Sequence, residues 1–476
     1  MLLSKPWYIF IPCVLLVLLL AALLGVAETR RNVPLDPEIR RVVVIHLDTT
    51  RADDLSCNGG IPRTPNIDQV AGRGMRYTNS IAPLPKTSPS VASFMTGRLA
   101  NRHGVYTIGG KLQDKYTTLA EVLRDHGFVT GGFASNPVVD KVGRERAKSA
   151  GFDQGFDVFK AIRNLPDVPE GAEANAVPRA LCETLAHEAM AFVDENRNNK
   201  FFLWMLNLDP HAPYAPPAPY DTLYMNHPEV RAGSVKLSPE VIHTQAYVSW
   251  RLDSHEYVAR HMGEVTLTDF WIGKLLRKIR QLPGKTLLVI TADHGESLGD
   301  ANYWFGHGSN IRHPCVNVPL IIACDGIIPA GVSDALVANV DIAPTILGLL
   351  GVPGDPLGAD GRSLQPTFDR QDPWPGRLVP LQTYYGTTWR GMRSTRFCLQ
   401  SLLDPKSGRR LQSLLYHIAD DPKEISDVST EFPDVLSSLL VAEESWFVRG
   451  QRPAEEVHLR HEPEMLRRLK SLGYMQ

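Results

Sequence analysis

Short apolar runs recur along the chain, and the way they end predicts buried parallel strands. RRVVVIHLD (residues 40–48) is rich in β-branched residues and ends in a carboxylate, and KTLLVITADHGE (residues 285–296) repeats this arrangement far downstream. Two further apolar runs, residues 200–208 and 316–324, are additional strand candidates. Continuous apolar runs of this kind are typical of strands covered on both faces.

Helical patterns separate these strand candidates. Residues 117–127 and 263–282 carry apolar side chains at helical spacing and end near glycine. This alternation predicts an α/β fold in which helices sandwich a mostly parallel sheet. In such sheets ligands bind beyond the carboxyl ends of the strands, which is where Asp48, Asp209 and Asp293 fall.

A change of pattern late in the chain predicts a second, smaller unit. Residues 209–220, DPHAPYAPPAPY, are too stiff for a helix or central strand, so we expect an ordered loop over the site, oriented by Asp209. After residue 375, short strand-like runs are followed by a charged helical pattern. We therefore expect a catalytic domain over residues 41–375, and a smaller α+β subdomain with a helical tail over residues 376–476.

The amino-terminal segment differs from the rest in composition. Trp7 to Ala27 form a chargeless run of 21 residues, which is long enough to cross a hydrocarbon core of about 30 Å. We therefore expect a membrane anchor within residues 1–28 and a linker over residues 29–40. A signal peptide cleaved after Ala27 is the alternative. Either segment places the remaining chain outside the cytoplasm, membrane-anchored or secreted. Four arginines after the run oppose this orientation under the positive-inside rule: Arg30, Arg31, Arg40 and Arg41.

Overall composition excludes some classes of protein. The chain has 476 residues, of which 43% are hydrophobic, so it can bury a large core. A formal net charge of −2 gives no basic excess, and we expect no nucleic-acid partner. The six cysteines show no C-x-x-C pair or metal-binding spacing, so they do not define a disulfide scaffold.

Candidate metal ligands stand at two of the predicted strand ends. Asp293 and His294 directly follow one strand, and both are common metal ligands, although an isolated Asp-His pair also serves as a capping or hydrogen-bonding pair. Asp48 ends a second strand. Two strand-end carboxylates in an apolar setting would repel each other without a cation between them. Together these residues favour a divalent metal site.

Six motifs then occur in a fixed order: VVVIHLDTTRADDLSCNG, TPNIDQVAGRGMRYTNSIAP, SPSVASFMTGRLANRHGV, FFLWMLNLDPHAPYAPPAPY, TADHGESLGD and VDIAPTILGLLG. This order resembles the sulfatase family of the alkaline phosphatase superfamily. The resemblance covers residues 41–366 and continues weakly through LYHIADDPKEISDVS, residues 415–429. It implies an alkaline-phosphatase-like fold and the hydrolysis of sulfuric or phosphoric esters.

The chain departs from the family pattern at the nucleophile. Sulfatases resemble one another in C/S-x-P-x-R, whose first residue is oxidised to formylglycine. With Pro89 setting the register, this chain has Thr87 in the first position and Val91 in place of the arginine. Threonine cannot become formylglycine, but a metal-bound threonine alkoxide is a competent nucleophile at phosphorus. We therefore predict attack by Thr87; alternatively, Thr87 only caps a helix that begins near Ser90.

The resemblance also implies a set of metal ligands. The second aspartate of many sulfatase metal sites is Thr49 here, which leaves Asp48, Thr87, Asp293 and His294 as ligands. Oxygen ligands with one imidazole suit manganese, zinc or magnesium better than an all-oxygen calcium cage. We therefore expect a bound divalent ion, which is manganese, zinc, magnesium or calcium.

Four more residues are candidates for the site by the same resemblance. His211 matches a histidine that contacts the transferred group or protonates the leaving oxygen, and His307 falls where a lysine or histidine binds the charged oxygens. Asn136 either donates to the substrate or shapes a turn. Lys86 would supply positive charge where the arginine is missing. Each histidine is alternatively an ordinary loop residue.

Together these features predict a metal-dependent hydrolase that cleaves phosphate diesters or phosphonate esters through a covalent Thr87 intermediate, with sulfate esters as a further class. One alternative is a transferase that passes a phosphoryl head group to a glycan or lipid acceptor. The other is a non-catalytic sulfatase-like protein that binds glycans. The expected partners are phosphorylated or sulfated small molecules, glycans or lipid head groups, and the membrane through the amino-terminal helix.

Overall fold

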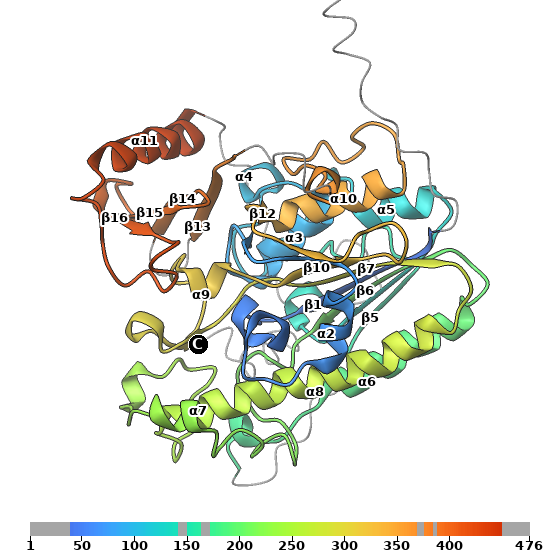
Figure 1. Cartoon of the computed structure of the whole chain (residues 1–476), viewed down its shortest axis with the longest axis horizontal. Coiled ribbons are helices and arrows are strands. Elements are labelled where there is room, and N and C mark those ends of the chain that lie inside the picture. The colour runs from blue at the N-terminus through green and yellow to red at the C-terminus, as the bar shows by residue number, and fades with distance from the viewer. Residues whose placement is uncertain (1–38, 141–149, 163–171, 369–375, 384–387, 450–476) are drawn as a thin grey trace, which may run out of the picture.

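The computed structural model describes residues 39–140, 150–162, 172–368, 376–383 and 388–449 (Figure 1). The expected membrane segment, Trp7 to Ala27, lies outside these ranges, as does the expected domain boundary near residue 375. In the described part of the chain, no helix combines the length and the apolarity that a membrane span requires. The anchor and the boundary therefore stay predictions.

An eight-stranded, mostly parallel sheet forms the centre of the molecule (Figure 1). The strand β10 runs antiparallel to both of its neighbours, and the other neighbouring strands are parallel. Helices flank the sheet, and this arrangement confirms the predicted fold class. In spatial order the strands are β11 (Gly331–Ser333), β2 (Met75–Tyr77), β10 (Leu320–Ala323), β7 (Lys285–Ala292), β1 (Ile39–Leu47), β6 (Phe201–Asn207), β4 (Val129–Ala134) and β5 (Val158–Ala161).

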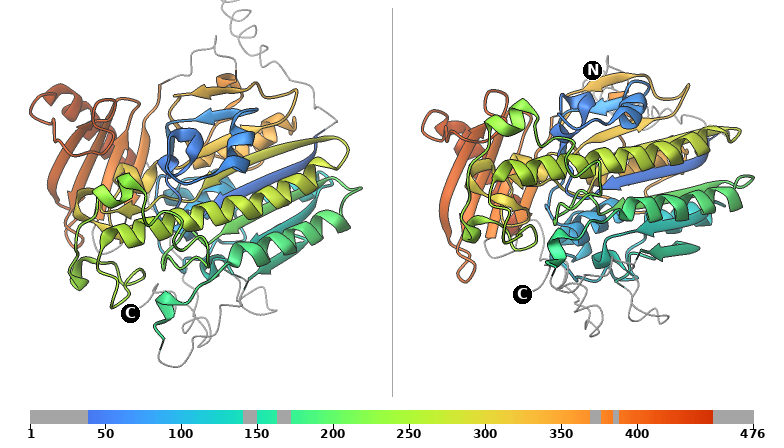
Figure 2. Two further views of the ribbon diagram at one scale, coloured as in Figure 1. Left: turned by 60° about the horizontal axis from the view of Figure 1, so that its bottom comes forward. Right: turned by 90° about the horizontal axis from the view of Figure 1, so that it is seen from below.

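Two groups of helices cover the two faces of this sheet (Figures 1 and 2). Successive side chains of a strand point to opposite faces, so the apolar run in β1 supplies both layers. Val42 and Val44 join one buried cluster, whereas Val43 and Ile45 join the other. The first cluster includes residues of α3 (Thr87–Thr96), α5 (Leu119–Asp125) and α10 (Ile342–Leu349), and the second those of α2 (Pro65–Ala71), α6 (Leu181–Glu195) and α8 (Ser254–Arg280).

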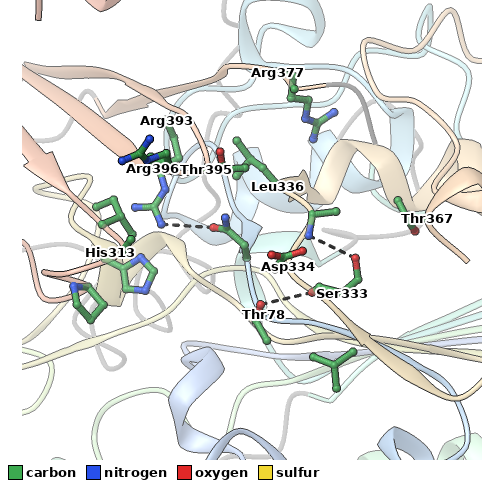
Figure 3. A pocket seen from close by; sticks show the side chains of 17 residues that line it. Thr78, His313, Ser333, Asp334, Leu336, Thr367, Arg377, Arg393, Thr395 and Arg396 are labelled. Atoms are coloured by element: carbon green, nitrogen blue, oxygen red, sulfur yellow. Dashed lines mark hydrogen bonds between the residues drawn. The ribbon is translucent and has the colours of Figure 1, made fainter. Parts of the chain in front are cut away.

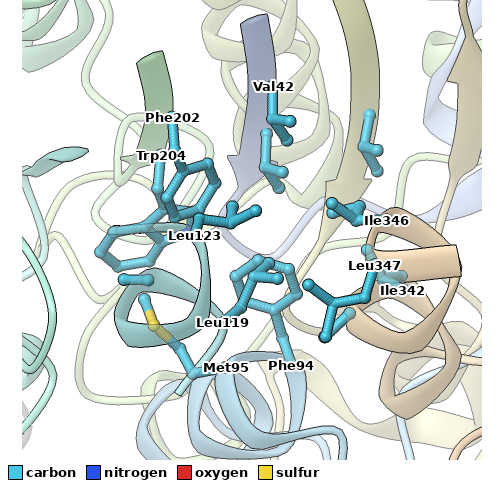
Figure 4. Close-up of a cluster of buried hydrophobic side chains, with 14 of the residues drawn as sticks. Val42, Phe94, Met95, Leu119, Leu123, Phe202, Trp204, Ile342, Ile346 and Leu347 are labelled. Atoms are coloured by element: carbon cyan, nitrogen blue, oxygen red, sulfur yellow. The ribbon is translucent and has the colours of Figure 1, made fainter. Parts of the chain in front are cut away.

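Aromatic side chains fill the first layer between the sheet and α3 (Figure 4). Trp204 and Phe202 on β6 are fully buried there together with Phe94 of α3. The indole Nε1 of Trp204 donates to Nδ1 of His46 at 3.1 Å, so the one polar atom of the ring has a partner inside the core. This layer packs α3 against the central strands, on whose ends the site is built.

A four-stranded antiparallel sheet forms the C-terminal subdomain (Figures 1 and 2). A buried apolar cluster that includes Ile311, Leu336 and Leu381 joins it to the main domain. Its elements are β13 (Val379–Thr383), β14 (Thr388–Arg393), β15 (Phe397–Leu403), β16 (Arg410–His417) and α11 (Pro433–Glu444). Short elements of the main domain are β3 (Ser80–Ile81), α4 (Ala100–His103), α7 (Pro228–Ala232), β8 (Ser297–Leu298), β9 (Trp304–Gly306), α9 (His313–Val316) and β12 (Val337–Ala338).

Replacing Trp204 with alanine should lower the free energy of unfolding by about 3–5 kcal/mol, because it opens a cavity and leaves His46 without its donor. Urea denaturation followed by circular dichroism measures this loss. Trp250→Ala is the matched control: Trp250 is 64% exposed, and its loss should change stability by no more than about 0.5 kcal/mol. Equal effects of the two changes would contradict the packing described here.

Candidate active site

The four predicted metal ligands converge where the central strands end. Asp48 directly follows β1, Asp293 and His294 follow β7, and Thr87 is the first residue of α3. Because β1 and β7 are neighbouring parallel strands, their carboxyl ends meet. Ligand atoms of the two aspartates and the histidine lie within 4.8 Å of one another. Thr87 Oγ1 lies 3.2 Å from His294 Nε2, and all four side chains are fully buried.

The atoms that face this space fit a divalent cation. Asp48 Oδ1 and Asp293 Oδ2 are buried and have no hydrogen-bond partner among the described residues, which is costly for carboxylate oxygens. His294 Nδ1 lies 3.0 Å from the carbonyl oxygen of Gly295, which can only accept, so Nδ1 carries the proton and Nε2 presents its lone pair. Two carboxylates, a hydroxyl and an imidazole suit manganese, zinc or magnesium.

The two carboxylates also disturb each other electrostatically. Burial raises the pKa of Asp48 well above its ordinary value, and the Asp293 carboxylate raises it further. Burial likewise raises the pKa of Asp293, although His294 acts in the opposite direction. A cation between these side chains would offset both effects, since it favours the ionised forms.

Thr87 is the first residue of α3, and its hydroxyl is directed at the other predicted ligands. The helix was expected to begin near Ser90, but it begins at Thr87, with Lys86 as the preceding cap residue in extended conformation. Proline is compatible with the whole first turn of a helix, so Pro89 did not mark the start. Thr87 Oγ1 contacts His294 Nε2 at 3.2 Å and Asn136 Nδ2 at 3.5 Å. The positive end of the helix therefore faces the site.

Asn136 combines two structural tasks. Its Oδ1 accepts from the backbone N–H of Val138 at 3.0 Å, which shapes the turn after β4. Its Nδ2 donates to Asp48 Oδ2 at 2.5 Å. The asparagine therefore occupies one oxygen of Asp48 and leaves Oδ1 directed into the ligand space. Contact between Asn136 and a substrate stays a prediction.

The remaining predicted residues surround the same space. The ring centroid of His307 lies 4.2 Å from that of His294 and 5.2 Å from that of His211. Lys86 is only 8% exposed, and burial lowers its pKa to about 8, so the ammonium form persists at neutral pH. Its side chain passes directly over Gly308, where a Cβ atom would lie 2.3 Å from Lys86 Cε. The structure therefore groups all eight predicted residues, but their catalytic roles stay predictions.

Glu296 is a site residue to which the sequence analysis assigned no role. Its Oε1 lies 3.2 Å from His307 Nδ1, and its Oε2 accepts from the Tyr214 hydroxyl at 3.0 Å. The carboxyl group is fully buried, and burial raises its pKa to about 7. Its position in the D-H-G-E motif was a usable signal. The hydrogen bond with Tyr214 had no signal in the sequence, because Tyr214 lies 82 positions away in the proline-rich loop.

The segment before His307 has an unusual backbone. Ala301, Asn302 and Phe305 all have positive φ angles, between 50° and 62°, a region that non-glycine residues rarely adopt. Phe305 is held there by burial and by stacking on Tyr257, with ring centroids 4.5 Å apart. Thr49, next to Asp48, also has a positive φ of 51°. Such strain persists only where the surroundings determine the conformation, as they do at many functional sites.

Buried charges fasten the loop that carries His211. The Asp209 carboxylate accepts from the backbone N–H groups of Leu181 and Cys182, both at 2.7 Å, so it orients the loop as expected. Two residues that the sequence analysis missed complete this attachment. Arg179 Nη2 donates to the carbonyl oxygen of His211 at 2.5 Å, and Glu264 Oε1 accepts from the backbone N–H of Ala215 at 3.0 Å.

Comparisons with known proteins agree with this arrangement. A model of the Sulfatase family matches residues 40–352. The chain is 26% identical over 347 residues to choline-sulfatase from Rhizobium meliloti (strain 1021), in a match that covers 63% of this chain and 66% of that relative, just under two thirds of its length. It is 27% identical over 395 residues to arylsulfatase A from Homo sapiens, covering 73% and 70% of the two chains.

A solved structure shows the same fold. The phosphonate monoester hydrolase from Silicibacter pomeroyi superimposes with a TM-score of 0.69 at 20% sequence identity. The match covers 87% of this chain and 96% of that chain.

Adding Mn²⁺ or Zn²⁺ to chelated protein should raise its Tm, because a cation gives the two unpaired carboxylate oxygens a partner. Asp293→Asn should weaken metal binding at least about tenfold. Metal content after dialysis, together with Tm, measures both effects. Asp325→Asn is the matched control, since that side chain is 69% exposed and forms a surface ion pair with Arg73. Unchanged metal content in the Asp293 variant would exclude this site.

Proposed function

Because this chain belongs to the sulfatase family, we propose that it is a metal-dependent ester hydrolase that uses Thr87 as its nucleophile. One observation carries the proposal: the Thr87 hydroxyl shares a buried space with His294 Nε2 and with two carboxylate oxygens that have no hydrogen-bond partner among the described residues. A non-catalytic glycan-binding protein has no need of this combination of nucleophile and metal ligands. The substrates we propose are phosphate diesters or phosphonate esters, with sulfate esters as a second class.

The proposed first step forms a covalent intermediate. A divalent cation held by Asp48, Asp293 and His294 would lower the pKa of the Thr87 hydroxyl and draw charge from the ester oxygens. Thr87 Oγ1 attacks phosphorus after losing its proton to water, and the bond between phosphorus and the leaving oxygen breaks. The leaving oxygen takes a proton from a site histidine. In the second step, water attacks phosphorus, the bond to Thr87 breaks, and Thr87 regains a proton.

The family resemblance suggests His211 as the proton donor, but we propose His307 instead, because its Nδ1 lies beside a carboxylate, whereas Nδ1 of His211 lies beside the carbonyl oxygen of Ala212. Since Nδ1 of His307 is directed at Glu296, its Nε2 is left for the substrate. Burial lowers the pKa of His307 well below its ordinary value, as do His294 and Lys86. The Glu296 carboxylate and a bound anionic ester favour the protonated form instead. We propose that substrate binding and proton uptake by His307 occur together.

Two observations favour different substrate classes. Threonine has a single hydroxyl, so it cannot release sulfate by the elimination that a formylglycine hydrate allows, and this supports phosphorus esters. The curated relatives at 26% and 27% identity are a choline-sulfatase and an arylsulfatase, and their names support sulfate esters. We give the nucleophile more weight because it takes part in the bond that forms.

We further propose that the enzyme acts outside the cytoplasm on phosphorylated or sulfated small molecules, glycans or lipid head groups. The chargeless run from Trp7 to Ala27 supports this placement. Membrane attachment would favour substrates at or near the bilayer.

Thr87→Ala should reduce turnover of bis(4-nitrophenyl) phosphate at least about 1000-fold while metal content is kept, because the nucleophile is lost. Ser88→Ala, the neighbouring residue of α3, should keep most activity. Intact-mass analysis after mixing with this diester or with 4-nitrophenyl sulfate should show an adduct only where Thr87 is present. Full activity of the alanine variant would exclude the mechanism. An added alcohol that captures the phosphoryl group in place of water would indicate the transferase alternative.

Glu296→Gln should lower kcat about 10- to 100-fold for esters with poorly acidic alcohols, because the amide no longer favours protonated His307. Esters of 4-nitrophenol, whose leaving group needs no proton, should be affected much less. Tyr214→Phe removes only the second hydrogen bond of Glu296 and should have the smaller effect of the two. A uniform loss with every leaving group would show that Glu296 acts on structure alone.

A further inference from the structure

A cavity of about 890 Å³ lies between the edge of the main sheet and the C-terminal sheet (Figure 3). Its walls come from the turn after β2, the segment between β11 and β12, the turn between β14 and β15, and the segment after β16. The strand β13 separates this cavity from the active site. Its first residue, Val379, pairs with Arg393 of the cavity, whereas its last residue, Thr383, contacts Gly308 beside His307. The four residues from Val379 to Thr383 span about 13 Å.

Arginine side chains dominate the charged lining of this cavity. Arg377, Arg393 and Arg396 all line it, with Asp334 as the acidic lining residue. Figure 3 shows Arg393, Arg396 and His313 on one side of the cavity and Arg377 across from them. Arg377 is neutralised by a bidentate ion pair with the buried Asp341. This pair occupies both terminal nitrogens of Arg377 and leaves only its Nε without a hydrogen-bond partner among the described residues. The side of Arg393 and Arg396 therefore offers more donors to a ligand.

Arg393 is buried with unused donors. Its side chain is 1% exposed, and its Nη2 donates to Asn79 Oδ1 at 3.3 Å. Its Nε and Nη1 have no hydrogen-bond acceptor among the described residues. Glu424 Oε1 forms a buried ion pair with Nη1 at 3.5 Å. Glu424 is held back because its Oε2 already accepts from His313 N and Gln400 Nε2. At this distance Glu424 offsets the charge of Arg393, while the N–H groups of Nε and Nη1 keep no hydrogen-bond acceptor among the described residues.

His313 adds a third polar group on the same side of the cavity as Arg393. His313 Nδ1 is buried and has no partner among the described residues. Arg396 is exposed at the mouth of the cavity, in the turn between β14 and β15. A guanidinium group presents its N–H donors in a planar fork that matches the oxygens of sulfate, phosphate or carboxylate groups. An oxyanion would satisfy the buried donors of Arg393 and also contact Arg396.

We infer that this cavity is a second oxyanion-binding site, which takes one sulfate or phosphate group on Arg393 and Arg396. The cavity is large enough to hold more than a bare ion, so the oxyanion is either free or one group of a larger sulfated ligand. The inference does not depend on the proposed reaction, because it concerns binding at a distance from Thr87.

The test measures binding, with turnover as a separate readout. Sodium sulfate should raise the Tm of the metal-loaded protein more than sodium chloride does at equal ionic strength. Arg396→Ala should increase the half-saturating sulfate concentration about tenfold, since one charged hydrogen bond is lost, and should leave turnover of bis(4-nitrophenyl) phosphate unchanged. Arg396 is exposed, so this variant should fold normally. Arg393→Met, a buried change, serves as a second variant where it folds.

A matched variant separates this cavity from the active site. Lys86→Met should weaken anion binding beside Thr87 but leave the Arg396-dependent stabilisation in place. Stabilisation that is lost in Lys86→Met and kept in Arg396→Ala would overturn the inference, as would no stabilisation beyond that of chloride. A sulfated heparin disaccharide is the second probe. Tighter Arg396-dependent binding of this disaccharide than of sulfate assigns the oxyanion to a glycan, and equal binding assigns it to a free anion.

Discussion

Two buried carboxylates that face one space determine how the rest of the site is built. Asp48 and Asp293 stand at the ends of neighbouring parallel strands, are fully buried, and each keep one oxygen without a hydrogen-bond partner among the described residues. Bringing two such groups together out of water is unfavourable unless a cation joins them or one takes a proton. The packing of the sheet therefore keeps the two carboxylates buried at a cost in free energy, which a bound metal would offset.

The groups around these carboxylates are held by contacts from several distant segments. Gly295 fixes the tautomer of His294, Asn136 occupies the second oxygen of Asp48, and Glu296 orients His307. Arg179 fastens the loop that carries His211. Each contact comes from backbone or from a buried charged or amide group, so the side chains that face the ligand space have few alternative positions. Such preorganisation is what ester cleavage by a metal and a nucleophile requires.

Membership of the sulfatase family and the reaction that we propose rest on different residues, and Thr87 is where they diverge. The fold is shared with sulfatases, but Thr87 supplies one hydroxyl and no aldehyde. The reaction at such a site depends on the functional groups present, not on the fold that holds them. For this reason the proposed chemistry follows the threonine, and the relatives mainly define the scaffold.

The sequence by itself determined the elements that depend on local pattern. Apolar runs and helical spacing predicted β1, β7, β6 and α8, because burial on both faces of a parallel sheet requires continuous apolar strands. The ends of these strands then located Asp48 and Asp293, since parallel strands present their carboxyl ends together. The sequence placed Thr87 at the site only through a family resemblance.

Only the tertiary structure decided the rest, because these contacts join residues that no local pattern connects. The start of α3 differed from the prediction since proline fits anywhere in a first helical turn. Glu296 and Tyr214, or Arg179 and His211, become partners only after packing brings distant loops together. The cavity near Arg393 likewise exists only because a second sheet packs beside the first. Local sequence encodes which face of an element is apolar, whereas packing decides which polar groups meet.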